Sequence, residues 1–193
     1  MGIRDIARSL GYLSDNIELN FVLDLPVPEP KLVALEHWAR ERARGYQAVT
    51  WSGLPPAAWR EKYTTMITLS ELDYPPEDRD PMPWTTERIE LLLHNEIKQG
   101  RNLITTMIMD SSSAPAAFTT LWVTNAPHEW ASQGTTAVLN AHRGHRLATS
   151  AKVANLRRLV TDFPQTRQLH TEVSVDNELM WAINDRFGFR PRT

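Results

Sequence analysis

The stretch from residue 134 to residue 163 most constrains the fold, because it reads as a strand, a short basic turn and a helix in immediate succession. Residues 135–139 have the β-branched and apolar character of a strand. Residues 141–146 form a turn that contains two histidines and two arginines. From residue 147 onward apolar side chains recur at helical spacing, most regularly at Val153, Leu156, Val160 and Phe163. This succession places the end of a strand beside the beginning of a helix.

The basic turn has the features of an anion site. The first turn of a helix leaves several backbone N–H groups unpaired, and the positive end of the helix dipole lies at the same place. Arg143 and Arg146 add positive charge, while Gly144 and Ala148 carry little or no side chain and allow a ligand to approach the backbone. The turn therefore indicates a site for a polyanion such as a pyrophosphate.

The same turn resembles motif A of the GCN5-related N-acetyltransferase (GNAT) superfamily, whose pattern is Arg/Gln-x-x-Gly-x-Gly/Ala. Arg143 takes the first position and Ala148 the last, while Arg146 replaces the middle Gly. The run His-Arg-Gly-His-Arg-Leu at residues 142–147 is similar to a variant from the second half of tandem-GNAT proteins. Residues 177–189 match the closing motif of that subfamily, Asn-x-x-Met-x-x-x-Asn-x-x-x-Gly-Phe. The resemblance extends over about residues 45–191.

The resemblance implies an α+β fold in which a mixed, V-splayed sheet lies between helical layers in an α/β/α arrangement. Residues 45–193 would form the acetyltransferase domain. Residues 1–44 would be an N-terminal arm, interpreted as the remnant of a preceding GNAT domain: a helix end near residues 6–12, a strand at 17–25, a proline-rich hinge and a linker helix. An unrelated arm is the alternative interpretation.

The strand at residues 17–25 is expected to complete the sheet beside the strand at residues 169–175. A GNAT sheet has a further strand at that edge, and an unfilled edge would leave backbone N–H and C=O groups unpaired. The alternating apolar side chains of residues 17–25 fit this position. Pairing within one chain, or exchange of the strand in a homodimer, would both satisfy the edge.

What the resemblance implies about the site concerns acetyl-CoA as the acyl-donor substrate. Ala137, Val138 and Leu139 would pair through their backbone with the pantetheine arm, and one of their N–H groups would polarise the thioester carbonyl. Asn177 would bind the pantetheine from the far side of the cleft, with Asn184 as a further contact. The pyrophosphate would be held by the loop and first helical turn, comprising Arg143, Gly144, His145, Arg146, Leu147, Ala148 and Thr149.

The catalytic groups are less well defined by the resemblance. Many GNAT enzymes carry an acidic Tyr where this chain has Asn184, and an amide cannot act as an acid near neutral pH. The acid and the Asn that are frequent in the tandem subfamily are replaced by Thr135 and Val173. Glu172 and Glu129 are the candidate bases, with surface carboxylates as the alternative interpretation, and His170 and His128 are comparable candidates.

Two functions follow from these observations. The first is an N-acetyltransferase that moves an acetyl group to an amine of a small molecule or peptide by direct transfer. The alternative is a degenerate acyl-CoA-binding or interaction domain without turnover. The resemblance also implies that the acidic, proline-rich segment at residues 72–84, between the first two helices of the domain, borders the acceptor site. A solvated loop is the alternative interpretation of its acids.

Composition narrows the classes of partner. The net charge of −2 and the pI of about 6.3 disfavour a general nucleic-acid or membrane-surface binder. The absence of cysteine excludes disulfides, thiolate catalysis and cysteine-ligated metals, and the histidines lack metal-ligand spacing. No apolar run approaches the length of a membrane span, and no secretion signal is recognisable, so a cytoplasmic location is predicted.

The remaining elements are predicted from periodicity and turn residues. Trp59, Tyr63, Met66 and Ile67 form one helical stripe that is expected to be core. A helix beginning at Thr85 or Thr86 is expected to turn Ile89, Leu92, Leu93 and Ile97 inward. The expected strands are residues 46–51, 103–109, 117–123, 135–139 and 169–175, and the expected further helices are residues 31–44 and 178–186.

Overall fold

The computed structural model describes residues 17–73, 84–124 and 129–192. These residues form one seven-stranded mixed sheet with the strand order β2-β3-β4-β5-β6-β1-β7. The strands are β1 (Glu18–Asp24), β2 (Gln47–Ser52), β3 (Arg101–Met109), β4 (Pro115–Thr124), β5 (Trp130–Val138), β6 (Gln168–Ser174) and β7 (Arg190–Pro191). The helices are α2 (Glu29–Arg40), α3 (Arg60–Asp73), α4 (Thr86–Lys98), α5 (Leu147–Asp162) and α6 (Glu178–Phe187), with 3-10 turns η1 (Ala57–Trp59) and η2 (Asn140–His142).

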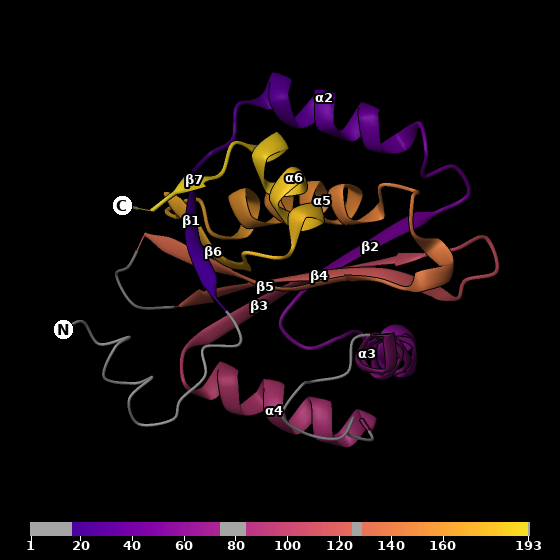
Figure 1. Ribbon diagram of the computed structural model, residues 1–193. Coiled ribbons are helices and arrows are strands. Elements are labelled where there is room, and N and C mark those ends of the chain that lie inside the picture. Colours follow the sequence, from indigo (N-terminus) through magenta and orange to yellow (C-terminus); the bar gives the residue numbers. More distant parts are fainter. Residues whose placement is uncertain (1–16, 74–83, 125–128, 193) are drawn as a thin grey trace, which may run out of the picture.

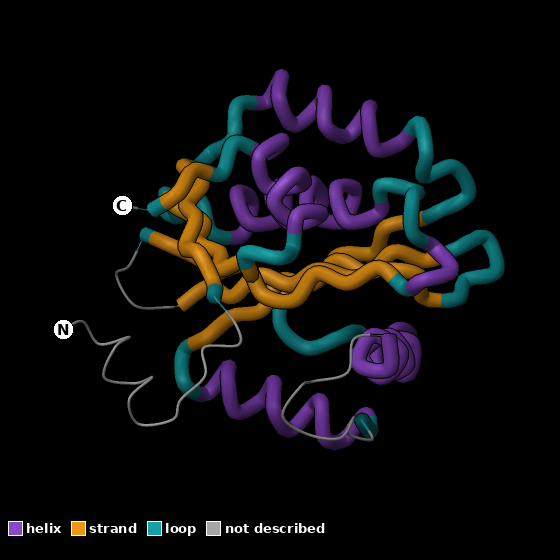
Figure 2. Tube along the Cα trace, viewed as in Figure 1, coloured by secondary structure: helices purple, strands orange, loops and turns teal. Residues whose placement is uncertain are grey.

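Helices cover both faces of the sheet (Figure 1). On one face α5 packs against β2, β3 and β4, with α6 beside it and α2 lying outside both. On the other face α3 packs on β4 and α4 on β3. Figure 2 shows the strands as a single layer between these two groups of helices. The predicted α+β class with an α/β/α arrangement is confirmed.

Hydrophobic clusters lie on both faces of the sheet, because the central strands are buried on both sides. β3 is buried along its last seven residues, as expected for a strand covered by helices on both faces. The core under α5 and α6 includes Phe21, Leu35, Leu159 and Phe187, and therefore joins β1 and α2 to the rest of the chain. The core under α3 and α4 contains Tyr63 and other members of the predicted stripe. The division at residue 44 stays a prediction.

The sheet opens between β5 and β6. These two strands run parallel and pair only over residues 130–132 and 168–170, after which they diverge. The predicted V-splayed sheet is therefore present, with its vertex at Ser132 and His170. Beyond the vertex, no strand of the described residues pairs with the edge of β5 that faces β6, while the other edge of β5 pairs with β4.

β1 completes the other side of β6. It pairs antiparallel with β6 along its whole length, with Phe21 opposite Thr171, and β7 pairs with β1 at Phe21 and Val22. The side chains of Phe21, Val22 and Leu23 are buried, which fixes the register. The pairing predicted for residues 17–25 is confirmed, and exchange of this strand in a homodimer stays a prediction.

Some details differ from the expectations. β5 begins at Trp130, five residues before the predicted start, because pairing with β4 and β6 rather than local propensity sets its length. In α4 Ile89 and Leu93 are buried, whereas Leu92 and Ile97 are 46% and 38% exposed. Leu92 lies at the margin of the helix stripe and Ile97 in the last turn, so neither is covered by β3. The predicted helix end at residues 6–12, residues 74–83 of the acidic segment and His128 lie outside the described residues.

Candidate functional site

The predicted anion loop connects β5 to α5 through two backbone positions of positive φ. Gly144 has φ of 80°, and Arg146, at the N-cap of α5, has φ of 58°. This region is uncommon for a residue with a side chain, so the surrounding contacts hold Arg146 there. The first backbone hydrogen bond of the helix is donated by the Ser150 N–H to the Arg146 carbonyl, at 3.1 Å. The preceding amides are thus the unpaired donors of the helix start.

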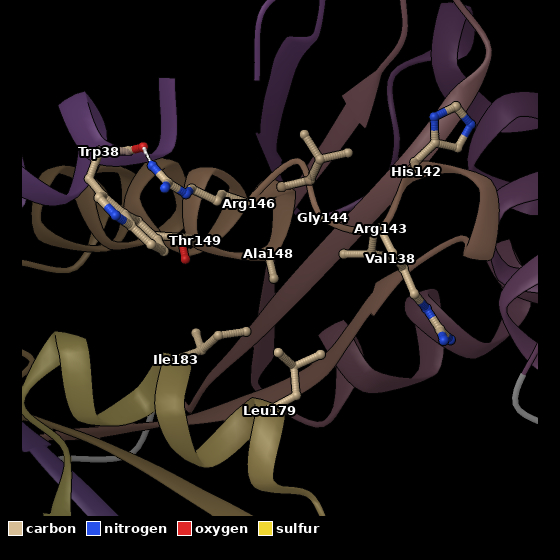
Figure 3. Close-up of a pocket in the computed structure, with 11 residues that line it drawn as sticks. Trp38, Val138, His142, Arg143, Gly144, Arg146, Ala148, Thr149, Leu179 and Ile183 are labelled. Carbon is tan, nitrogen blue, oxygen red and sulfur yellow. Dashed lines mark hydrogen bonds between the residues drawn. The ribbon is translucent and has the colours of Figure 1, made fainter. Parts of the chain in front are cut away.

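Two adjoining cavities lie at this loop and in the open part of the V. The larger, of about 590 Å³, extends from the end of β5 and the start of α6 to Ser70 and Glu71 of α3. The smaller, of about 170 Å³, lies at the start of α5 and is closed by α6 and by Trp38 of α2 (Figure 3). Five residues take part in the lining of both cavities: Val138, Arg143, Ala148, Leu179 and Ile183.

Most of the predicted cofactor residues lie together around these cavities. Nine of them line one cavity or both: Ala137, Val138, Arg143, Gly144, Arg146, Leu147, Ala148, Thr149 and Asn177. Asn177 caps α6, and its side-chain oxygen accepts a hydrogen bond from the Met180 N–H at 3.0 Å. Leu139, His145 and Asn184 do not line either cavity.

The two arginines of the loop lie differently. The Arg146 Nη1 donates to the Trp38 carbonyl at 2.6 Å and to Glu41 Oε2 at 2.8 Å, and its guanidinium lies 4.0 Å from the Trp38 ring centroid. Figure 3 shows Arg146 directed toward Trp38 and Arg143 extending away from it, on the other side of the cavity. Arg146 therefore joins the loop to α2. No local pattern indicates this contact, because α2 lies about a hundred residues before Arg146 in the sequence.

Both histidines of the loop also make contacts that hold it in place. His142 Nδ1 lies 3.0 Å from the Tyr46 hydroxyl, and His145 Nδ1 lies 3.0 Å from the Arg42 carbonyl. Both partners belong to the segment that connects α2 to β2. His145 is thus placed outside the cavity walls, and its predicted contact with the cofactor stays a prediction.

Asn184 lies in the protein interior beside a buried lysine. It is 2% exposed, and its Oδ1 accepts a hydrogen bond from Lys152 Nζ at 3.0 Å. Burial lowers the pKa of Lys152 to about 7. The Asn184 Nδ2 has no hydrogen-bond partner within the described part of the chain. Neither residue reaches the V, so this position supplies no acid to the cavities.

A third, polar cavity of about 470 Å³ lies at the vertex of the V. His170, Glu172 and Ser132 line it, together with Glu18 and Asn20 of β1. His170 and Glu172 alternate along β6 with side chains of the core under α5, so this cavity faces away from α5.

His170 lies in a defined environment in the polar cavity. Its ring stacks on Trp130 with centroids 5.4 Å apart, and Arg192 Nη1 lies 3.4 Å from its Nδ1. Partial burial, followed by the charge of Arg192, lowers the pKa of His170. Glu172 is exposed at the cavity wall, whereas Glu129 lines a separate depression with Asp24 and Arg167. The structure thus separates the two candidate bases.

The described residues hold neither a cluster of His and acidic side chains suited to a metal ion nor a helix able to cross a membrane.

No family model matches the chain, and no curated protein matches its sequence. Solved structures do match. A tandem GNAT protein from the clavulanic acid biosynthesis pathway aligns with 98% of this chain and 55% of its own, at 26% identity and a TM-score of 0.70. A GCN5-related N-acetyltransferase from Sphaerobacter thermophilus aligns with 98% of this chain and 52% of its own, at 14% identity and a TM-score of 0.64.

A third match is AAC(6')-Iy in complex with a bisubstrate analog, CoA-S-monomethyl-acetylneamine. It aligns with 75% of this chain and 91% of its own, at 12% identity and a TM-score of 0.51. The chain spans about half the length of the first two structures. These likenesses establish the fold.

Proposed function

Because the chain has the GNAT fold, we propose that it binds acetyl-CoA in the V and transfers the acetyl group directly to an amine of a small molecule or peptide. The observation that carries this proposal is the cavity of about 590 Å³ that begins where β5 and β6 diverge and adjoins the start of α5. An extended ligand with an anionic end fits this combination of an open strand edge and a helix N-terminus.

The chain's own groups fit the two parts of such a ligand. The unpaired edge of β5 at Ala137 and Val138 offers backbone donors and acceptors to the amides of a pantetheine arm. The amides at the start of α5, with Arg143, offer donors to a pyrophosphate. A hydrogen bond to a charged group contributes roughly 1.5–3 kcal/mol, so the loop would dominate the affinity.

Acetyl transfer needs an oxyanion donor and a proton acceptor near the vertex. A β5 backbone N–H would stabilise the oxyanion. The acceptor amine would approach through the polar cavity, where Glu172 and His170 face it. Because the pKa of His170 is lowered, its imidazole is neutral near pH 7 and is able to accept a proton.

The alternative, an acyl-CoA-binding domain without turnover, has one observation in its favour. The position that holds an acidic Tyr in many GNAT enzymes is Asn184, which is buried against Lys152. A leaving thiolate would have to take its proton from water.

Thiol release from acetyl-CoA, measured with a panel of primary amines, tests the proposal. Transfer predicts release that depends on the amine, together with a mass gain of one acetyl group on it. Saturating acetyl-CoA, near 100 times its dissociation constant, is expected to stabilise the fold by about 2.7 kcal/mol. Stabilisation without release for any amine would support the alternative, and no stabilisation by acetyl-CoA or CoA would contradict both.

A further inference from the structure

Two basic side chains lie against the ring of Trp38 of α2, at the end of the smaller cavity. The Arg146 guanidinium carbon is 4.0 Å from the indole centroid, and that of Arg186 from α6 is 4.3 Å away. Three elements that are remote in sequence therefore meet at one aromatic ring. Cations within about 6 Å of an indole face are attracted to it, which orders both side chains.

The two guanidiniums are only partly neutralised. Arg146 forms an ion pair with Glu41 at 2.8 Å, and no ion pair of Arg186 is found among the described residues. Two like charges close to one ring repel each other. The arrangement thus holds more positive charge than its surroundings neutralise, which favours an anionic ligand.

The position of the two guanidiniums relative to the smaller cavity indicates the class of ligand. Trp38 and Arg146 line the smaller cavity, and so does Ile183, one turn before Arg186 on α6. The cavity also contains the start of α5, where the proposed pyrophosphate would lie. A coenzyme A molecule continues from its pyrophosphate into a nucleotide that carries a further phosphate, at the ribose 3′ position.

We propose that Trp38 holds Arg146 and Arg186 as a cation pair that binds the phosphates of the nucleotide end of coenzyme A. The linker helix α2 is then part of the cofactor site. Trp38 acts as a positioning residue, and Arg186, the more exposed of the two arginines, meets the 3′-phosphate. This inference rests on the proposed function, and it assigns to α2 and α6 a binding role that the loop motif does not contain.

Calorimetric titration of the full chain with CoA, and in parallel with dephospho-CoA, tests the inference. Trp38→Ala is expected to raise the Kd for CoA about tenfold, and Trp38→Phe, which keeps an aromatic face, to restore most of the affinity. Arg186→Gln is expected to weaken CoA about tenfold and dephospho-CoA much less, because the latter lacks the 3′-phosphate. An equal loss for both ligands would contradict the assignment of Arg186 to the 3′-phosphate.

Arg157→Ala is the matched control, because it also removes contacts between α5 and α2. Its Nη atoms bind Glu29 and Glu36 of α2 at 3.0 and 3.1 Å, away from the cavities. This variant is expected to change the melting temperature and leave the Kd for CoA within twofold of the unaltered chain. If Arg157→Ala weakens CoA as strongly as Trp38→Ala, then α2 acts only by docking and the inference is wrong.

The outcomes separate this inference from the proposed function. Trp38→Ala and Arg186→Gln variants that bind CoA within twofold of the unaltered chain would overturn the inference alone. Failure of the unaltered chain to bind CoA would overturn the proposed function. Should Trp38→Ala not fold, Arg186→Gln still decides, because Arg186 is exposed and its replacement leaves Trp38 and α2 in place.

Discussion

The loop before α5 lies in the V, whereas the strand β1 lies along the other edge of β6 and lines the polar cavity at the vertex. The loop follows β5 directly, so the strand end and the helix start fix its position. β1 comes from the opposite end of the sequence and is held by its pairing with β6 and by its buried side chains. The loop carries a motif that suggests what is bound, whereas β1 carries only a pattern that suggests where it pairs. Local sequence thus indicates the ligand, and remote segments complete the walls around it.

Deletion of residues 1–26 is the most severe test of the role that this comparison assigns to β1. The deletion takes away the buried side chains of Phe21, Val22, Leu23 and Leu25, each of which contributes roughly 1.5–3 kcal/mol. The expected loss of at least about 6 kcal/mol is comparable with the whole stability of a domain. It would also expose the edge of β6, and the chain is expected to aggregate. Urea unfolding and sedimentation of the soluble fraction measure both effects.

A milder pair of variants keeps this prediction testable if the shortened chain does not fold. Leu23→Ala is expected to lower the free energy of unfolding by about 2–5 kcal/mol. Leu19→Ala, on the same strand but 39% exposed, is expected to change it far less. Equal effects of the two variants, or a shortened chain as stable and soluble as the full one, would show that β1 is not an integral strand.

Lys152, which is buried in α5, allows a second comparison of the two regions. Its pKa falls from an ordinary 10.5 to about 7 through burial. Between about pH 7 and pH 10 the unfolded chain therefore binds more protons than the folded chain, and stability rises with pH. Between pH 7 and pH 9.5 the expected gain is about 3 kcal/mol. Below about pH 7 both states are protonated, and this contribution no longer changes with pH.

The matched variants for this pH dependence are Lys152→Met and Lys98→Met. Lys152→Met is expected to remove the rise in stability, while Lys98→Met, at an exposed position of α4, is expected to keep it. Urea unfolding curves at the two pH values give the comparison. An identical slope in Lys152→Met and the unaltered chain would contradict the buried, neutral lysine.

The smallest expected effect concerns a comparison of the loop before α5 with the polar cavity. Arg143→Gln is expected to weaken CoA binding by roughly 1.5–3 kcal/mol, because it removes a charged donor from the loop. Glu172→Gln, in the polar cavity, is expected to leave the Kd for CoA within about twofold and to reduce amine-dependent thiol release. Calorimetry and the thiol assay together make the test. A larger loss of CoA affinity in Glu172→Gln than in Arg143→Gln would reverse the assignment of the two sides.

Much of the fold was predictable because its signals are local or follow from sheet completeness. The succession of β5, loop and α5 is contiguous, and the alternation of residues 17–25 matched an edge that had to be filled. The helix stripe at Tyr63 and Met66 was identified as core from its spacing alone. Such patterns survive folding because burial of one face is what creates them.

The parts of the site that could not be predicted from the sequence depend on contacts between distant segments. The sequence places Arg146 in the anion loop, but the contacts that orient its guanidinium are made with Trp38 of α2 and with Glu41, which directly follows α2. Lys152 reads as one of several basic residues of the loop and helix, yet it is buried beside Asn184. The direction of a long side chain is decided by tertiary neighbours, and no spacing within α5 encodes them.

The place of β1 between β6 and β7 also affects how the chain acquires its fold. β3 and β4 are joined by a short turn, so their pairing closes a small loop. β1 must instead find β6 across nearly the whole sequence, from residue 21 to residue 171. Closing so long a loop is entropically unfavourable and tends to occur late. During synthesis β1 emerges before its partner exists, and it is expected to dock last; a φ-value near zero for Leu23→Ala in refolding kinetics would report that order.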